Sequence, residues 1–154
     1  MNAPRHLRST ATKFLSILCF FGLLAGLQAA SSAKSVHLAA GSPKVSLPFH
    51  DERRATIAVE VAIKNESAEL TKVFVEIAVK DAEGNVVTEA EAGLDIAAGG
   101  QEATNQWMNF KRPKIWTKEK PYLYTVHTLI LRGTDVIDSS KTSFGVGPDA
   151  PAIK

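Results

Sequence analysis

The sequence predicts an all-β fold, a sandwich of two sheets that follows an N-terminal export signal. Apolar and polar residues alternate with a period of two in several segments, and turns rich in Gly, Asn and Asp separate these segments. After residue 33, no stretch shows the 3.6-residue period of a helix. The chain has 154 residues, 45% of them hydrophobic and 22% charged, which is the composition of one globular domain.

Residues 1–33 have the layout of a secretory signal peptide. Three basic residues precede an almost uninterrupted apolar run over residues 14–27. Spanning a bilayer core takes about 20 helical residues. The shorter run therefore favours a cleaved signal over a membrane anchor. Small side chains at Ser31 and Ala33 place the cleavage near Ala33. We expect a signal helix and a secreted or periplasmic mature protein.

The predicted mature chain has no cysteine and almost no net charge. Cys19 is the one cysteine and lies in the apolar run, so neither a disulfide nor a thiolate metal site is expected after cleavage. Removing residues 1–33 takes away three of 18 basic residues and none of 16 acidic ones, which changes the formal net charge from +2 to −1. This charge gives no reason to expect a nucleic acid or an anionic membrane as partner.

The first half of the mature chain predicts an edge strand and one long inner strand. We expect residues 34–42, rich in Ser, Ala and Gly, to be a flexible lead-in, followed by a short edge strand over residues 45–49. A strictly alternating strand covers residues 55–64. The residues that it turns toward the core are Ile57, Val59, Val61 and Ile63.

A hairpin follows, because a second alternating strand over residues 73–80 leads into residues 81–85, where Gly and Asn tolerate positive φ. An extended segment resumes at Val86.

The second half predicts a further segment over residues 102–110, a loop, and two final strands over residues 122–132 and 136–144. About seven short strands are typical of an immunoglobulin-like sandwich. We therefore place the sandwich at residues 43–147 and a C-terminal tail at residues 148–154.

One segment carries several uncommon residues at fixed spacing. Residues 113–124 read Pro-Lys-Ile-Trp-Thr-Lys-Glu-Lys-Pro-Tyr-Leu-Tyr. This resembles the Pro-x-Leu-Trp-Ser-x-x-x-Pro-x-Leu-Tyr segment of the immunoglobulin-like domain in glycoside hydrolase family 2, which includes β-galactosidases, β-glucuronidases and β-mannosidases. A strand that ends in Asn, a turn with Gly, and a final Phe-Gly-Val also fit. The matching positions are Asn65, Gly84, Pro113, Trp116, Pro121, Leu123, Tyr124 and residues 144–146.

The resemblance implies a non-catalytic domain. Members of the family hydrolyse β-glycosides with two glutamates on a barrel domain, and the resemblance reaches none of that barrel. We therefore expect no glycosidase activity from this chain alone, and a catalytic glycosidase domain or a polysaccharide as partner. The leading hypothesis is a scaffold or interaction domain linked to carbohydrate metabolism. The alternative is a self-standing secreted module that binds a carbohydrate or a protein.

The candidate contact residues lie in the same segment. Trp116 and Tyr122 offer aromatic rings on which a sugar could stack, and Lys114 and Lys118 belong to a basic cluster that could contact an acidic partner. The favoured alternative is structural: Trp116 closes one end of the sandwich, Tyr124 acts as a tyrosine corner, and the lysines are solvated.

No cofactor or metal site is predicted. The histidines of the mature chain are far apart and lack ligand spacing. Glu60 and Glu76 would resemble a glycosidase carboxylate pair if they faced the same side of neighbouring strands, although alternate outward charges are also what a solvent-facing sheet requires. Asn65-Glu66-Ser67 matches a glycosylation sequon, but a turn is needed at that strand end.

Overall fold

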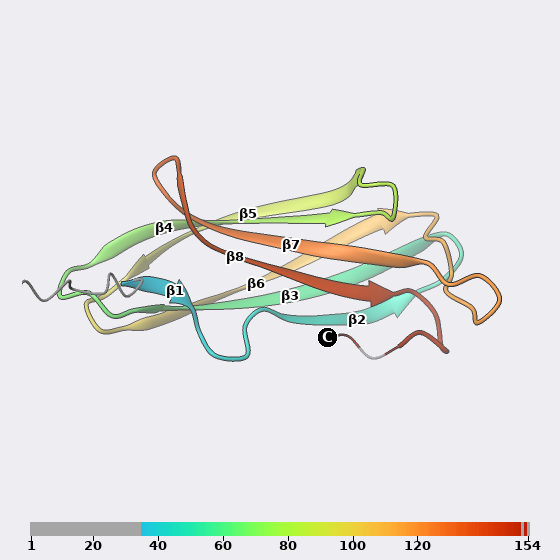
Figure 1. Cartoon of the computed structure of the whole chain (residues 1–154), viewed down its shortest axis with the longest axis horizontal. Helices are drawn as coiled ribbons and strands as arrows, with labels where there is room; N and C mark the ends of the chain where they lie inside the picture. Colours follow the sequence, from blue (N-terminus) through green and yellow to red (C-terminus); the bar gives the residue numbers. More distant parts are fainter. Residues whose placement is uncertain (1–34, 152, 154) are drawn as a thin grey trace, which may run out of the picture. The chain divides into compact units, whose positions relative to one another are not determined.

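The computed structural model of the chain describes residues 35–151 and 153, which contain eight β-strands and no helix (Figure 1). The predicted signal helix lies outside the described residues. The strands are β1 (Val36–Leu38), β2 (Lys44–His50), β3 (Arg54–Asn65), β4 (Thr71–Lys80), β5 (Val86–Ile96), β6 (Gln101–Lys111), β7 (Leu123–Arg132) and β8 (Asp135–Gly145).

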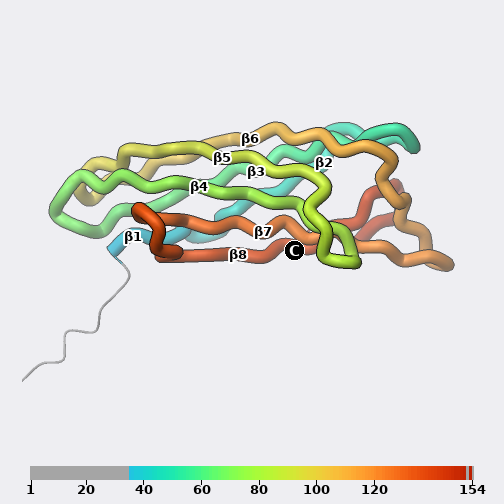
Figure 2. The backbone as a smooth tube through the Cα atoms, turned by 90° about the horizontal axis from the view of Figure 1, so that it is seen from above, coloured from blue at the N-terminus to red at the C-terminus, as the bar shows by residue number. Residues whose placement is uncertain are grey.

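The strands form two antiparallel sheets that pack face to face as an immunoglobulin-like sandwich. In one sheet β3 is central, with β6 on one side and β1 and β2 on the other; the second has the order β5-β4-β7-β8. The sheet edges meet where β5 contacts β6 and where β1 contacts β8 (Figure 2). At the second edge the Leu38 N–H donates to the Asp138 carboxylate at 2.8 Å.

The eighth strand arises because the first edge strand is broken in two. Val36 pairs with Asn65 near the end of β3, and Lys44 pairs with Glu60 nearer its middle. The prediction of a flexible lead-in over residues 34–42 is therefore corrected, because β1 lies within that segment and is hydrogen-bonded to β3. Three residues are too few to show a period of two, so the sequence pattern did not reveal this strand.

The core is built from the alternating rows that the sequence predicts. On β3 the four predicted inward residues are fully buried, and they face the inward residues of β4 and β7 across the sandwich. Burying one such side chain contributes about 1.5–3 kcal/mol relative to leaving it in water. The inward residues of β4 and β7 are Val73, Val75, Ile77, Val79, Tyr124, Val126, Thr128 and Ile130.

Both predicted hairpins are present, between β4 and β5 and between β7 and β8. Gly84 has a φ of 90° in the first turn, a backbone conformation that residues with a Cβ rarely adopt. β5 runs on to Ile96, well beyond the extended segment expected at Val86, because it pairs with β4 along nearly its whole length. The two hairpins carry the β4–β5 turn and the start of β7 to the same end of the sandwich (Figure 1).

Candidate functional site

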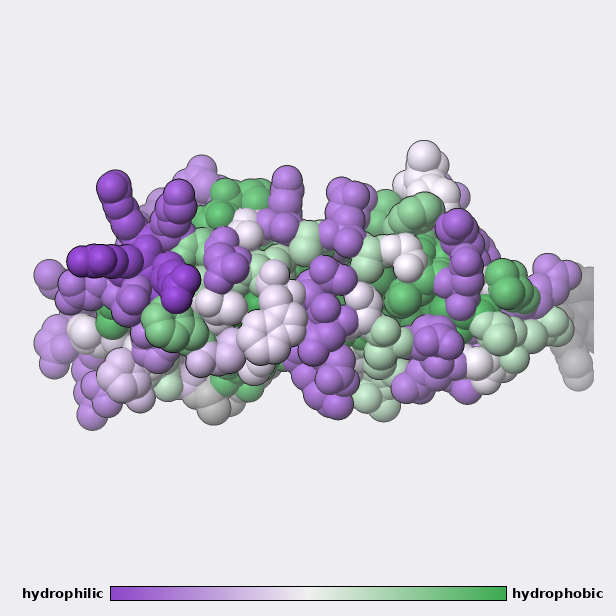
Figure 3. Space-filling view, turned by 180° about the vertical axis from the view of Figure 1, so that it is seen from behind, coloured by the Kyte–Doolittle hydropathy of each residue, from purple (hydrophilic) through white to green (hydrophobic). Residues whose placement is uncertain are grey.

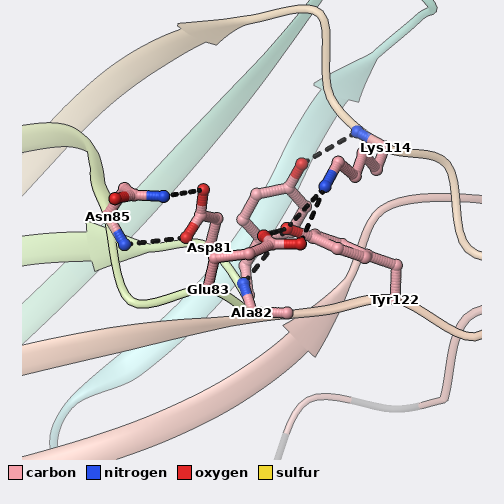
Figure 4. Close-up of polar contacts among 7 residues, drawn as sticks. Asp81, Ala82, Glu83, Asn85, Lys114 and Tyr122 are labelled. Carbon is pink, nitrogen blue, oxygen red and sulfur yellow. Dashed lines mark hydrogen bonds and ion pairs between the residues drawn. The ribbon is translucent and has the colours of Figure 1, made fainter.

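The four candidate contact residues all lie at one end of the sandwich, which we call the Tyr122 end. It consists of the β4–β5 turn, residues 81–85, and the β6–β7 loop, residues 112–122. Figure 4 shows Glu83 from the turn reaching Lys114 and Tyr122 from the loop. This arrangement joins two segments that are about thirty to forty residues apart in the chain.

Glu83, Lys114 and Tyr122 form a closed polar triangle. The Lys114 Nζ donates to Glu83 Oε1 at 3.1 Å and to the Tyr122 hydroxyl at 3.2 Å. The Tyr122 hydroxyl donates to Glu83 Oε2 and accepts from the Ala82 N–H at 3.1 Å. Every hydrogen-bonding position of the Tyr122 hydroxyl is therefore used within the protein.

The Tyr122 ring has two neighbours within the protein. The Lys114 ammonium lies over its face, 4.3 Å from the ring centroid, and Tyr124 packs against it in an edge arrangement with centroids 5.2 Å apart. A sugar that stacked on the face under Lys114 would have to displace that side chain. The triangle therefore holds the loop in place instead of presenting an open aromatic platform.

Tyr124 is buried and ties the loop to the core. Its ring packs against Phe110 and Phe144, with centroids 5.0 Å and 5.6 Å away. Its hydroxyl accepts a hydrogen bond of 2.8 Å from the Lys114 N–H, ten residues upstream. This is the geometry of a tyrosine corner. Burial raises the pKa of the Tyr124 hydroxyl, so it stays a neutral group.

Trp116 packs against the chain as it leaves β8. Its backbone N–H donates to the Val146 carbonyl at 2.6 Å. A Cβ on Gly145 would lie 3.1 Å from Trp116 Cδ1 and 3.2 Å from its Cβ. The indole thus rests on a surface that only glycine leaves open, and it is half-buried. It closes this end of the sandwich.

The charges of the triangle are fixed near neutral pH. The hydrogen bond from Tyr122, followed by that from Lys114, lowers the pKa of the Glu83 carboxyl. The hydrogen bond to Glu83, followed by that to Tyr122, raises the pKa of Lys114. Both pKa values move away from the range near neutral pH in which an acid or base catalyst works.

Glu60 and Glu76 do not form a glycosidase-like pair, and both are outward charges of the kind that a solvent-facing sheet requires. β3 and β4 belong to different sheets, and the two side chains point outward on opposite sides of the sandwich. Glu60 instead forms an ion pair of 3.0 Å with Lys44. Within residues 35–151 and 153, no group of three or more His, Cys, Asp or Glu side chains is arranged to hold a metal ion.

The sequence model of the family described as glycosyl hydrolases family 2 matches residues 36–146. The chain belongs to this family. A β-galactosidase of Bacteroides ovatus is 28% identical over 116 residues, which are 75% of this chain and 14% of that enzyme. A β-glucuronidase of Formosa agariphila is 30% identical over 95 residues, which are 62% of this chain and 10% of that enzyme.

Solved structures of family 2 members have the same sandwich. A family 2 β-glucuronidase superposes with a TM-score of 0.68 at 25% identity, over 73% of this chain and 13% of its own. A member from Bacteroides cellulosilyticus superposes with a TM-score of 0.69 at 22% identity, over 73% of this chain and 15% of its own. The chain therefore corresponds to a small, non-catalytic domain of these enzymes.

The remaining family 2 positions have structural places. Pro113 is buried where the loop begins and Leu123 starts β7, whereas Pro121 and Lys118 are exposed in the loop. The Thr117 hydroxyl accepts from the Lys120 N–H at 3.1 Å and so closes the turn that holds Lys118. The structure thus brings Lys114 and Tyr122 together but leaves Lys118 apart from them.

Asn65 lies at the opposite end of the sandwich and closes it. We call this the Asn65 end; it consists of the β3–β4 turn (residues 66–70) and the β5–β6 turn (residues 97–100). The side chain is 0% exposed. Its Nδ2 lies 2.8–3.1 Å from the carbonyls of Glu69, Ile96 and Ala97, and its Oδ1 accepts from Ser67. An amide in this position is closed to glycosylation in the folded protein.

Sequence reasoning missed one exposed aromatic residue. Trp107 on β6 is 63% exposed, and its side chain points away from the core. The signal was present in residues 102–110: because side chains alternate between the two faces of a strand, inward Met108 and Phe110 imply an outward Trp107.

No helix in the described part of the chain is long and apolar enough to cross a membrane.

Proposed function

We propose that this domain is a non-catalytic scaffold of a family 2 glycoside hydrolase system, which supports a catalytic glycosidase domain. The observation that carries the proposal is the extent of the match: residues 36–146 align, yet they correspond to only 10–15% of the compared relatives. The ion pair of Glu83 and Lys114 also supports the proposal. The two side chains bind each other and hold the β6–β7 loop, and their pKa values are shifted away from those of an acid or base catalyst near neutral pH.

The first experiment is an activity assay on the purified protein. We expect no hydrolysis of nitrophenyl β-galactoside or β-glucuronide above the buffer rate. Hydrolysis that a single Glu→Gln substitution abolishes would contradict the proposal.

A chimera tests the scaffold role directly. Residues 36–146 replace the corresponding domain of the Bacteroides ovatus β-galactosidase, and we expect a folded enzyme that hydrolyses the β-galactoside. Trp116→Ala in the chimera should lower the melting temperature and the activity, because the indole packs where the chain leaves β8. Lys118→Ala is the matched control in the same loop and should change neither. A folded chimera without activity would argue against a supporting role.

Export is a separate part of the proposal. The basic head and short apolar run of residues 1–33 support it. N-terminal sequencing of the expressed protein should find a mature end near residue 34. An intact N-terminus in the cell-associated fraction would contradict export.

A further inference from the structure

Trp107 lies on the outer face of the sheet formed by β1, β2, β3 and β6. In its cross-strand row the neighbours are Ala58 on β3 and, beyond it, Ser46 on β2. Both side chains are small, so no bulky group crowds the 63% exposed indole from that side. A large aromatic ring left open on a flat face is a feature that a ligand can cover.

Two asparagines flank the indole on the same face of β6. Asn105 and Asn109 stand two residues before and after Trp107, so their side chains share its direction. The Asn109 Oδ1 accepts from the Thr56 hydroxyl at 2.7 Å, which orients the amide. Within residues 35–151 and 153 the Asn109 Nδ2 and the Asn105 amide have no hydrogen-bond partner. They are available as donors and acceptors for hydroxyl groups.

Two shallow hollows continue this face along β3. The first, of about 250 Å³, is lined by Ala58 and Asn105 among others. The second, of about 260 Å³, lies toward Ala62 and Ala103. From Asn109 to Ala103 the face extends over about 20 Å at 3.4 Å per residue. Figure 3, a view from behind, shows strongly hydrophilic side chains gathered at one end and separate ones along the rest, with paler and apolar surface between them.

The charges in the middle of this face cancel. Lys44 and Glu60 line both hollows and form an ion pair of 3.0 Å. Arg54 and Lys111 pair with each other in register at the end of the sheet, and the Arg54 guanidinium lies over the Phe49 ring, 4.7 Å from its centroid. Over the two hollows the charges are thus paired as Lys44 with Glu60, which favours a neutral ligand over a uronate there.

We propose that this Trp107 face, which comprises the outer residues of β2, β3 and β6, binds a chain of neutral hexopyranose residues. A pyranose ring has one apolar C–H face and a rim of hydroxyls, and the Trp107 face offers an indole bordered by two amides. A protein interface would instead bury contiguous apolar residues around its aromatic anchor. Here the neighbours of Trp107 in its own row are small and those along β6 are polar, and the exposed Phe49 on β2 stands in the next row, beyond Thr56.

In the bound state one sugar ring stacks on the indole, and Asn105 and Asn109 hydrogen-bond to its hydroxyls. The following rings lie over the two hollows along β3. The site differs from the Trp116 and Tyr122 pair that the sequence singles out, whose rings are packed within the protein. The inference extends beyond the scaffold role and does not depend on it, because the Trp107 face needs no catalytic domain to be complete.

Native affinity electrophoresis of the purified protein tests the proposal. The gels contain soluble mixed-linkage β-glucan, galactan, xyloglucan or galactomannan, or polygalacturonate as the charged comparison. We expect at least one neutral polymer to retard the protein. Trp107→Ala should weaken that binding about tenfold or more, which is the loss expected when one aromatic stacking contact is removed.

Two further variants separate sugar recognition from general stickiness. Asn109→Ala removes an amide but no aromatic surface and should also weaken retardation. Phe74→Ala is the matched control, because Phe74 is 46% exposed on the outer face of the other sheet; it should bind like the wild type. All three positions are exposed, so each variant should melt near the wild-type temperature. Acrylamide should quench Trp107 fluorescence less once the polymer is bound.

Four results would overturn the proposal. The first is no retardation by any neutral polymer, and the second is unchanged retardation of Trp107→Ala. The third is retardation by polygalacturonate alone that disappears in 0.15 M salt. At this ionic strength the Debye length is about 8 Å, so such a loss would assign the binding to surface charge. The fourth is self-association of the wild type that Trp107→Ala abolishes without any polymer effect, which would make the face a contact between two copies of the chain.

Discussion

At the Asn65 end of the sandwich one buried amide binds the main chain of two turns, whereas at the Tyr122 end two exposed charged side chains and the partly buried Tyr122 join a turn to a loop. Asn65 is 0% exposed, and its partners are mainly backbone groups. The Glu83–Lys114 pair has more than half of each side chain in water. At both ends side chains hold neighbouring turns or loops together. Water can replace the Glu83–Lys114 contact at the Tyr122 end, but it cannot replace the contacts of the buried Asn65 amide.

This difference predicts unequal costs of disruption. A buried carbonyl that loses its partner keeps its full desolvation penalty, while an exposed carboxylate regains water. Stability should therefore depend strongly on Asn65 and weakly on Glu83. The Tyr122 end nevertheless contains two buried anchors, Tyr124 and the Gly145–Trp116 contact, which should give intermediate effects.

The largest effect is expected for Asn65→Ala. The substitution leaves the carbonyls of Ile96 and Ala97 and the N–H of Ser67 without the side chain that they contact. We expect a loss of about 2–4 kcal/mol in the free energy of unfolding, measured by urea denaturation. Ser67→Ala, which removes one hydroxyl from the same network, should cost less. A loss within experimental error for Asn65→Ala would remove the distinction between the two ends.

Gly145→Ala should come next. A Cβ there would lie 2.8 Å from the Ala150 Cβ and 3.1 Å from Trp116, so the loop or the chain after β8 must move. We expect a loss of about 1–3 kcal/mol in a thermal or urea melt. Gly93→Ala is the control in the same sheet, because its new Cβ would meet Phe74 at an ordinary 3.6 Å. Equal stability of the two variants would show that the Trp116 contact is loose.

Tyr124→Phe should have a smaller effect. The variant keeps the ring contacts with Phe110 and Phe144 but removes the acceptor of the Lys114 N–H. We expect a loss of about 1 kcal/mol in the free energy of unfolding. Tyr122→Phe should cost less, because its hydroxyl lies among exposed partners that water can satisfy. A greater loss for Tyr122→Phe would reverse the assignment of the main anchor at this end.

The sequence predicts the strands better than the contacts that close the two ends. The period-two rows place β3, β4, β7 and β8 almost to the residue, because burial on one face determines which side chains can occupy each position. Asn65, Trp116 and Tyr124 could be singled out through the family resemblance. Their partners could not be predicted. Ile96 and Ala97 contribute backbone carbonyls, and Gly145 leaves room because it has no side chain; the sequence pattern signals neither kind of contact.

The outward residues were the least predictable. Trp107 and Phe74 alternate with core residues in the same way as the polar residues beside them, so a period-two pattern assigns them to solvent without saying what covers them. The separation of Glu60 from Glu76 also required the topology, because consecutive strands of a sandwich pair in one sheet or cross to the other. Sequence separation alone does not distinguish these cases.

The smallest effect at neutral pH is expected for Glu83→Gln, but its pH dependence should distinguish the ends. The pKa of Glu83 is lowered in the folded state, first by Tyr122 and then by Lys114, so its contribution is present above about pH 4.5, the ordinary value of the free group, and is lost as the pH falls through the folded pKa. The pKa of Lys114 is raised, so its contribution is lost only above about pH 10.5.

The stability difference between wild type and Glu83→Gln should therefore shrink in acid. Asp81 titrates in the same direction, because the Asn85 side chain lowers its pKa, and the Tyr122 end as a whole should loosen. Amide hydrogen exchange can measure this loosening at single residues. The protection factors of the Ala82 and Asn85 amides should fall between pH 5 and pH 3, about the range in which such carboxylates protonate. The amides of Asn65 and Ser67 should keep theirs, because the contacts of the Asn65 side chain involve no titratable group. Parallel loss at both ends would mean that acid acts on the whole sandwich and not on the exposed end.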